Sequence, residues 1–434
     1  MRSTTFAVAL AGGLALLTSS IVAMRARAQE SQLDSLRASA NSSSGGAAAA
    51  LAYGRALRRA GRSAAALSEL RRARTIAPPQ SEVGATIDWE LARTFLERHD
   101  LPAARAACLA LGSRPRHAAD GHACAAEASL ASQRATEALG EASSALAADP
   151  RSYEAKVAEA HSEDLALDPA KSEAAFREAI AWRPEGVEAH VGLGRVLLKN
   201  GAREDGLAEL RRAVRLDPTA PDPLYELAMA LAPGPESAAL LERATRERPS
   251  FSDAWLALGT QALSAGRLAE AKSAGEATAR QDAKSVGPHM LLGKVALADG
   301  RYDDAIQEGE TALKILANSA PAKLLVADAD AKKGYVDRAL EAYQAAWGLD
   351  RSDPTPLVHA SEACHAAGRD TSARAFAVKA SQEFPDWGPG WAALGDALVG
   401  QGEKRAARDA YAKALSASGP VDRDSVQKKL ATLR

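Results

Sequence analysis

A recurrence of similar residues at intervals of 34 constrains this chain more than any other feature of its sequence. Counted back from Gly395, the interval reaches small residues that follow apolar, alanine-rich runs: Ser361, Ala327, Gly293 and Gly259. One interval of 31 and one of 38 interrupt the series, which otherwise continues through Ala228, Gly194, Ala160, Ala126, Ala92 and Gly54. These eleven residues define position 8 of eleven repeats over about residues 47–420, numbered 1 to 11 in chain order. The chain is therefore a tandem array.

Each repeat is typical of two helices joined by a tight turn. Position 15 is glycine in seven repeats, and glycine reaches the left-handed backbone angles that end a helix. Position 20 is usually small, position 24 is large in several repeats, and a proline often follows the second helix, which it cannot continue. No stretch alternates apolar and polar residues with a period of two, so the sequence predicts an all-α fold.

The residues at these positions resemble the tetratricopeptide repeat. In the last repeat the likeness rests on Trp391, Leu394, Gly395, Gly402, Ala407, Tyr411 and Ala414, and in the fifth on Leu193, Gly194, Leu197, Gly201, Ala213 and Pro218. Repeats 2 and 3 depart most, because they lack the turn glycine and the aromatic residue at position 24. The resemblance implies a right-handed superhelical α-solenoid of about eleven helix–turn–helix repeats over residues 47–420, whose first helices line the concave face. Apolar residues on one face of 421–434 predict a helix that caps the array.

The first residues predict export. Residues 1–28 combine Arg2, an apolar run and an Ala26-Arg27-Ala28 cleavage site, as in a secretory signal peptide. Alternatively, residues 5–24 form an uncleaved membrane anchor, the chain's only expected contact with a membrane. Both interpretations place the repeats in the periplasm or cell envelope. Residues 29–46, polar and rich in serine and glycine, are expected to form a flexible leader.

The charge balance bears on the class of partner. The formal net charge is -1, and a nucleic-acid partner would need a basic stripe that neutralises phosphates. The sequence therefore favours a protein or peptide partner over a nucleic acid.

The motifs that would indicate an enzyme are absent from the sequence. It contains no G-x-S-x-G, GxxxxGK[ST] or HExxH motif, so we expect no catalytic residues and no cofactor. Cys108, His117, His122 and Cys124 lie within seventeen residues, but their spacing matches no common zinc finger, and no metal is expected. Cys108 and Cys124 could meet between two repeats, either as a disulfide or as two buried thiols. Cys364 would stay a free thiol.

The candidate binding residues occupy position 5. The family geometry points this position of each first helix into the groove, and no repeat carries a charge there: Leu51, Trp89, Ala123, Val157, Val191, Tyr225, Leu256, Met290, Leu324, Val358 and Ala392. The large members, Trp89, Val157, Val191, Tyr225, Leu256, Met290, Leu324 and Val358, are the predicted partner-binding residues. The alternative is that some of these side chains turn inward and pack against neighbouring helices.

Two sets of charged residues accompany this strip. Position 2 is acidic in five consecutive repeats, at Asp120, Glu154, Glu188, Asp222 and Asp253. Acids in a first helical turn also favour the helix dipole, which explains them without a partner. Position 9 is basic in early repeats, at Arg55, Arg93 and Arg195, and acidic in late ones, at Asp328, Glu362 and Asp396. Opposite fields at the two ends of a groove would orient a bound segment.

These features favour a non-enzymatic protein-interaction scaffold of the cell envelope that binds a partner segment in its concave groove. The alternative is an accessory subunit that acts in trans with an envelope enzyme such as a glycosyltransferase or peptidase. The repeats fill the chain to Leu433 and leave no room for a catalytic domain in this sequence.

Overall fold

The computed structural model describes residues 30–42, 45–78, 80–114 and 116–433, and over these ranges the chain is all helical apart from turns and one isolated β-bridge between Trp387 and Ser418. It forms two compact units that divide after Ala230. The helices of the N-terminal unit are α2 (Ala47–Arg59), α3 (Ser63–Ile76), α4 (Glu82–Glu97), α5 (Leu101–Gly112), α6 (Ala118–Ala131), α7 (Ala135–Ala148), α8 (Tyr153–Leu165), α9 (Pro169–Trp182), α10 (Val187–Lys199), α11 (Arg203–Leu216) and α12 (Pro221–Ala230).

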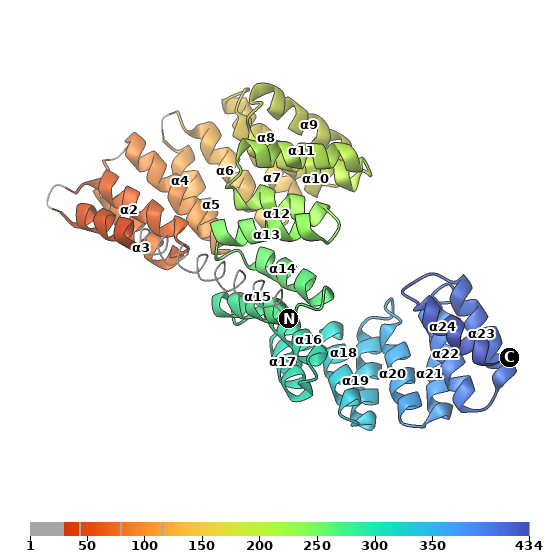
Figure 1. The fold of residues 1–434 in the computed structure, drawn as a ribbon. Coiled ribbons are helices and arrows are strands. Elements are labelled where there is room, and N and C mark those ends of the chain that lie inside the picture. The colour runs from red at the N-terminus through yellow and green to blue at the C-terminus, as the bar shows by residue number, and fades with distance from the viewer. Residues whose placement is uncertain (1–29, 43–44, 79, 115, 434) are drawn as a thin grey trace, which may run out of the picture. The chain divides into compact units, whose positions relative to one another are not determined.

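The C-terminal unit continues the same alternation and adds one last helix (Figure 1). Its helices are α13 (Pro235–Glu247), α14 (Ser252–Ser264), α15 (Leu268–Gln281), α16 (Val286–Ala298), α17 (Tyr302–Ile315), α18 (Ala320–Lys332), α19 (Val336–Leu349), α20 (Thr355–Ala366), α21 (Asp370–Glu383), α22 (Gly388–Gly400), α23 (Lys404–Ser416) and α24 (Arg423–Thr432). The even-numbered helices from α2 to α22 are the first helices of the eleven repeats, and the odd-numbered helices are the second ones. This confirms the predicted all-α array of eleven helix pairs.

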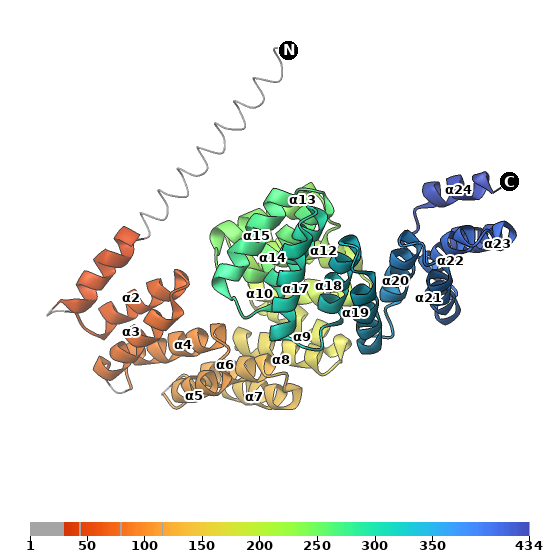
Figure 2. The same cartoon turned by 90° about the horizontal axis from the view of Figure 1, so that it is seen from below.

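Within each unit the first helices lie on the inner side of the array. Inside a unit, each first helix contacts the first helix of the next repeat, for example α6 with α8 and α14 with α16 (Figures 1 and 2). Successive second helices make no comparable contact in the described part of the chain. Since helices on the inside of a curve are closer together than those outside, the first helices form the inner face of each unit.

Small residues allow the two helices of a repeat to cross closely. Ala66, Ala271 and Ala407, all at position 20, are fully buried. Position 8 complements position 24: a Cβ atom added at Gly395 would lie only 2.4 Å from Cε1 of the buried Tyr411. The ring therefore occupies the space that a side chain at position 8 would need.

In every repeat except the sixth, the turn between the helices keeps one backbone conformation at position 15, whether or not glycine is present. All seven glycines at position 15 have positive φ, from 70° at Gly368 to 84° at Gly334. In repeats 2, 3 and 4, which lack the glycine, His99, Gln133 and Leu167 have φ of 56°, 58° and 62°. A residue with a Cβ pays roughly 1–2 kcal/mol for this conformation. The departure of these repeats from the sequence pattern therefore changes the strain of the turn, not its course.

Ring nitrogens at position 4 fasten each of four first helices to the preceding repeat. Trp255 Nε1 donates to the carbonyl of Pro249 at 3.0 Å, and Trp391 Nε1 donates to that of Pro385 at 2.8 Å. Nε2 of His190 lies 2.9 Å from the carbonyl of Pro184, also six residues earlier. In the same way, Nε2 of His289 lies 3.2 Å from the carbonyl of Ala283. Tryptophan and histidine thus serve one structural purpose at this position.

The two ends of the described chain differ from each other. Residues 30–41 are helical, whereas a flexible leader was predicted there, because Leu33 finds an apolar partner in the first repeat and is 4% exposed. At the other end, Val426 of α24 and Leu433 directly after it pack against the last repeat, as expected of a capping helix. The predicted signal peptide or anchor, residues 1–28, lies outside the described residues.

Candidate functional site: the first-helix face

The predicted strip at position 5 does not form one continuous exposed surface. Four members are buried: Leu51, Ala123, Val157 and Val358 are 9%, 2%, 7% and 4% exposed. The others are half-buried: Trp89, Val191, Tyr225, Leu256, Met290, Leu324 and Ala392. Val157 and Val358 belong to hydrophobic clusters between helices. These two side chains therefore pack against neighbouring helices, as the alternative interpretation predicted, and they interrupt the exposed strip.

Two members of the strip, Leu256 of α14 and Met290 of α16, line one pocket. Its volume is about 380 Å³, and Leu263 and Leu291 add to its apolar wall. The tip of Leu256 reaches the backbone of α16 at Gly287, where an added Cβ atom would lie 2.7 Å from its Cδ1. The pocket thus exists because a glycine of one first helix leaves room for the side chain of the preceding one.

The rim of this pocket is polar. Thr260 and Lys294 occupy position 9 of the same two first helices, and both side chains are exposed. An apolar floor with a hydroxyl and an ammonium group at its edge suits one apolar side chain of a partner together with a polar or anionic neighbour.

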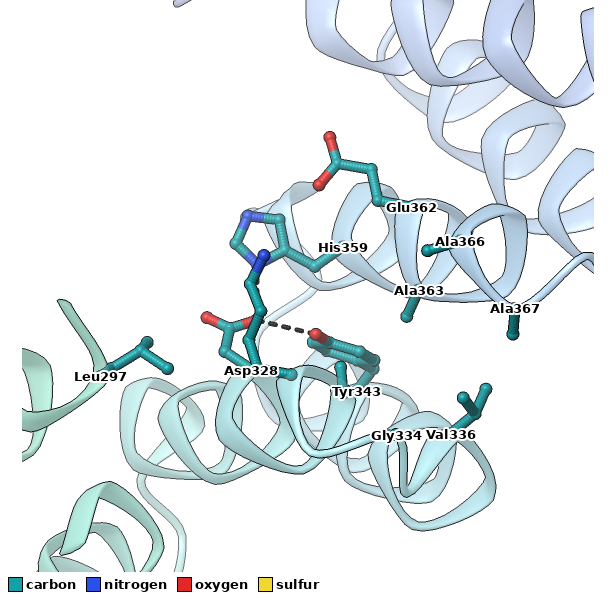
Figure 3. Close-up of a pocket in the computed structure, with 12 residues that line it drawn as sticks. Leu297, Asp328, Gly334, Val336, Tyr343, His359, Glu362, Ala363, Ala366 and Ala367 are labelled. Atoms are coloured by element: carbon teal, nitrogen blue, oxygen red, sulfur yellow. Dashed lines mark hydrogen bonds and ion pairs between the residues drawn. The ribbon is translucent and has the colours of Figure 1, made fainter. Parts of the chain in front are cut away.

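A second cavity of the C-terminal unit lies between α18, α19 and α20 and measures about 590 Å³. Figure 3 shows Tyr343 and His359 directed at the carboxylate of Asp328. Tyr343 Oη donates to Asp328 Oδ1 at 2.8 Å, and His359 Nδ1 lies 2.7 Å from the same oxygen. Leu297 and Val336 add apolar surface around this cluster.

The carboxylate of Asp328 sets the protonation of its neighbours. Burial lowers the pKa of His359, but the hydrogen bond and charge of Asp328 outweigh this effect and raise it. Burial also raises the pKa of Tyr343, and the charge of Asp328 raises it further, so the hydroxyl group stays protonated. Burial raises the pKa of Glu362, which lies on the same rim. The cavity thus offers hydrogen-bond donors and acceptors of both charges to a polar ligand group.

The predicted charge polarity of position 9 is largely neutralised within the fold. Arg55 Nε lies 2.6 Å from Oε1 of the buried Glu90. At the other end, Asp396 accepts a hydrogen bond of 2.6 Å from Tyr411 and forms an ion pair of 2.7 Å with Lys429 of α24. These charges therefore hold neighbouring helices together, and only part of the predicted field faces a ligand.

The acidic residues at position 2 lie in the first turns of their helices, where the dipole interpretation puts them. Asp120 lies 2.8 Å from His117, and Glu154 lies 2.7 Å from Arg183. Their positions need no bound partner.

Cys108 of α5 and Cys124 of α6 are joined in a disulfide, with their Cα atoms 5.4 Å apart. The close approach depends on Gly112 and Gly121, because a Cβ at Gly121 would lie 2.2 Å from the Cα of Gly112. Cys364 is a buried free thiol. His117 and His122 contact carboxylates instead of the two sulfurs, and no cluster suited to a metal ion occurs among the residues that the structure describes.

Sequence reasoning missed two features of this face. The ring donors at position 4 could have been found by aligning Trp255 and Trp391 with His190 and His289, each eight residues after the end of the preceding helix. The strained turn residues could have been found as gaps in the glycine series.

Over the described ranges, no helix is both long and apolar enough to span a bilayer.

Helix pairs stacked in register, with the first helices on the inner face of each unit, define a helical repeat protein. A model of the tetratricopeptide repeat matches residues 157–221 and 227–286, in register with repeats 4 to 7. These matched residues are tetratricopeptide repeats, and the remaining helix pairs keep the same register. The fold supports a protein–protein interaction scaffold.

Solved structures with related folds were found, whereas no curated protein matches the chain. Tom70 of yeast is 13% identical, and the match covers 89% of this chain and 95% of that one at a TM-score of 0.46. PilF of Pseudomonas aeruginosa is 17% identical over 48% of this chain and 95% of its own, at 0.42. A tetratricopeptide repeat protein of Parabacteroides merdae is 15% identical over 65% and 99%, at 0.42. No function is transferred from these similarities.

Proposed function

We propose that this protein is a non-enzymatic scaffold of the cell envelope that holds a segment of a partner protein against its first-helix face. One observation carries the proposal: Leu256 and Met290, which the family resemblance selected as partner-binding residues, line a single pocket of about 380 Å³ between two first helices. A pocket of this size takes one large apolar side chain, and the interface energy of such segments concentrates in a few central anchors.

The polar rim supports the same assignment. Lys294 is exposed beside the pocket and has no ion pair in the described part of the structure. A partner with an apolar side chain in the pocket and an acidic group beside it would satisfy both features, and the ion pair would set its orientation more than its affinity.

Photocrosslinking tests the scaffold role. A photoreactive amino acid at position 256 in the native organism should capture a discrete protein, and the same residue at Ser273, exposed on the second helix α15, is the matched control. The double variant Leu256→Ser, Met290→Ser should abolish capture by a probe placed at Thr260 on the rim. Equal capture from positions 256 and 273 would contradict the proposal. If the captured protein is a glycosyltransferase or peptidase, the protein acts as that enzyme's accessory subunit.

The envelope location rests on residues 1–28 and has its own test. We expect the mature chain to begin at Gln29 in an exported fraction, which mass spectrometry of the intact protein measures. A chain that retains Met1 in the membrane fraction would establish the anchor over residues 5–24, and a chain that retains it in the cytoplasm would refute export.

A further inference from the structure

Two strained turn residues of the N-terminal unit border the same cavity. Gln133 and Leu167 occupy position 15 of repeats 3 and 4, where seven other repeats have glycine, and both have positive φ. Leu167 is 86% exposed, which makes it the most exposed large apolar side chain of the described residues. Neither the turn nor the core requires this leucine, because glycine makes the same turn without strain. Residues held in such conformations often serve a binding site.

The cavity measures about 580 Å³ and lies at the end of the first helices where these turns begin. Leu130 of α6, Leu165 of α8 and Leu167 give it an apolar side. The other side carries position 9 of three successive first helices: Glu127 of α6, His161 of α8 and Arg195 of α10. It therefore combines an apolar wall with a row of ionisable groups.

Most of the charges around this cavity already have partners. Lys199 Nζ lies 2.6 Å from Asp164, and Arg195 Nε lies 3.9 Å from Glu226 of α12. His161 packs edge-on against the ring of Phe176 with 4.9 Å between ring centroids. Burial, together with the charge of Arg195, lowers the pKa of His161 to about 4, so this ring is neutral at pH 7.

Glu127 is the carboxylate left without a direct partner among the described groups that line the cavity. Burial and the charges of Glu188 and Glu154 raise its pKa to about 7, against the opposing charge of Arg93. Its side chain is accessible to solvent but lies on the inner face, where neighbouring helices limit its hydration. The electrostatic environment of Glu127 thus favours an added positive charge.

We propose that this cavity binds a protein segment that places a lysine or arginine side chain against Glu127 and an adjacent apolar side chain against Leu130, Leu165 and Leu167. The inference rests on the proposed scaffold function and assigns it a second site, in the N-terminal unit. The partner residue is basic because it would complement the charge of the Glu127 carboxylate. Its neighbour is apolar because it would cover the exposed side chain of Leu167.

The chain offers variants that separate binding from folding. Leu167→Gly removes the exposed side chain and relieves the turn, so it should weaken binding while thermal unfolding stays the same or shifts upward. Glu127→Gln keeps the size of the side chain and removes its charge. His99→Gly makes the same turn substitution in repeat 2, away from this cavity, and Glu185→Gln neutralises an exposed acid between α9 and α10.

A library of random twelve-residue peptides displayed on phage is the probe. On the wild-type protein we expect enrichment of peptides with lysine or arginine beside large apolar residues. Enrichment of these peptides should fall about tenfold or more on Leu167→Gly and on Glu127→Gln, and persist on His99→Gly, Glu185→Gln and the double variant Leu256→Ser, Met290→Ser.

Enrichment of peptides without a basic residue, or equal enrichment on Leu167→Gly and the wild type, would overturn the proposal. If all enrichment depends on Leu256 and Met290 alone, this second site is refuted while the scaffold function stands. If no peptide is enriched and photocrosslinking at position 256 also captures nothing, both fail.

Discussion

The strip at position 5 allows a test that separates packing from binding within one protein. Leu256 and Met290 are half-buried and line a pocket, whereas Val157 and Val358 occupy the same repeat position and are 7% and 4% exposed. All four residues are apolar and occupy the same position of a first helix. Substitution of each pair by serine should therefore have opposite consequences for stability and for partner binding.

The expected magnitudes follow from burial. Full burial of a valine side chain is worth roughly 1.5–3 kcal/mol, and its removal leaves a cavity, so Val358→Ser should cost about 2–4 kcal/mol. Half-buried side chains lose less, about 1 kcal/mol each for Leu256→Ser and Met290→Ser. As interface anchors, however, each should cost about 1–3 kcal/mol of binding energy, or roughly 5- to 150-fold in affinity.

Two measurements decide the matter. Thermal or urea unfolding compares the free energies of unfolding, and titration of the purified partner, once photocrosslinking has identified it, compares the affinities. Tyr225→Ser, a third central member of the strip, lies in the other unit and is made separately. The reasoning is refuted if Leu256→Ser, Met290→Ser destabilises the fold more than Val157→Ser, Val358→Ser does, or if the folded double variant binds the partner like the wild type.

Three further predictions concern stability. Loss of the disulfide in Cys108→Ser should cost about 3 kcal/mol, because the bond to Cys124 closes a loop of about seventeen residues; non-reducing peptide mapping that finds both thiols free would contradict it. Gly395→Ala should destabilise the last repeat by about 1–3 kcal/mol through overpacking, whereas Gly140→Ala, in open space on α7, should stabilise by about 0.5–1 kcal/mol in the same unfolding assay. Because the folded state raises the pKa of Glu127 from 4.5 to about 7, its contribution to stability falls as pH rises between those values. Glu127→Gln should thus match the wild type at pH 4 and be more stable at pH 8, by about 1 kcal/mol after allowance for solvent screening; equal unfolding curves at pH 8 would refute this.

The sequence by itself determined the helix pairs. The interval of 34 residues predicts two helices per repeat, glycine at position 15 predicts the turn, and alanine at position 20 predicts a close helix crossing. The sequence suffices for these features because the same residue type produces the same local geometry in each repeat. The same register indicated that Cys108 and Cys124 could meet, and together with the geometry of the family it resembles it selected Leu256 and Met290.

Only the tertiary structure decided which residues of that register are available to a partner. Val157 and Met290 occupy one position, yet one is buried and the other lines a pocket, because exposure depends on the size of the side chains on the neighbouring helices. Likewise, the gap in the glycine series at Leu167 indicates a turn residue, but it does not indicate that this leucine borders the cavity of Glu127. Periodicity is a property of each repeat, whereas burial and hydration are properties of the contacts between repeats.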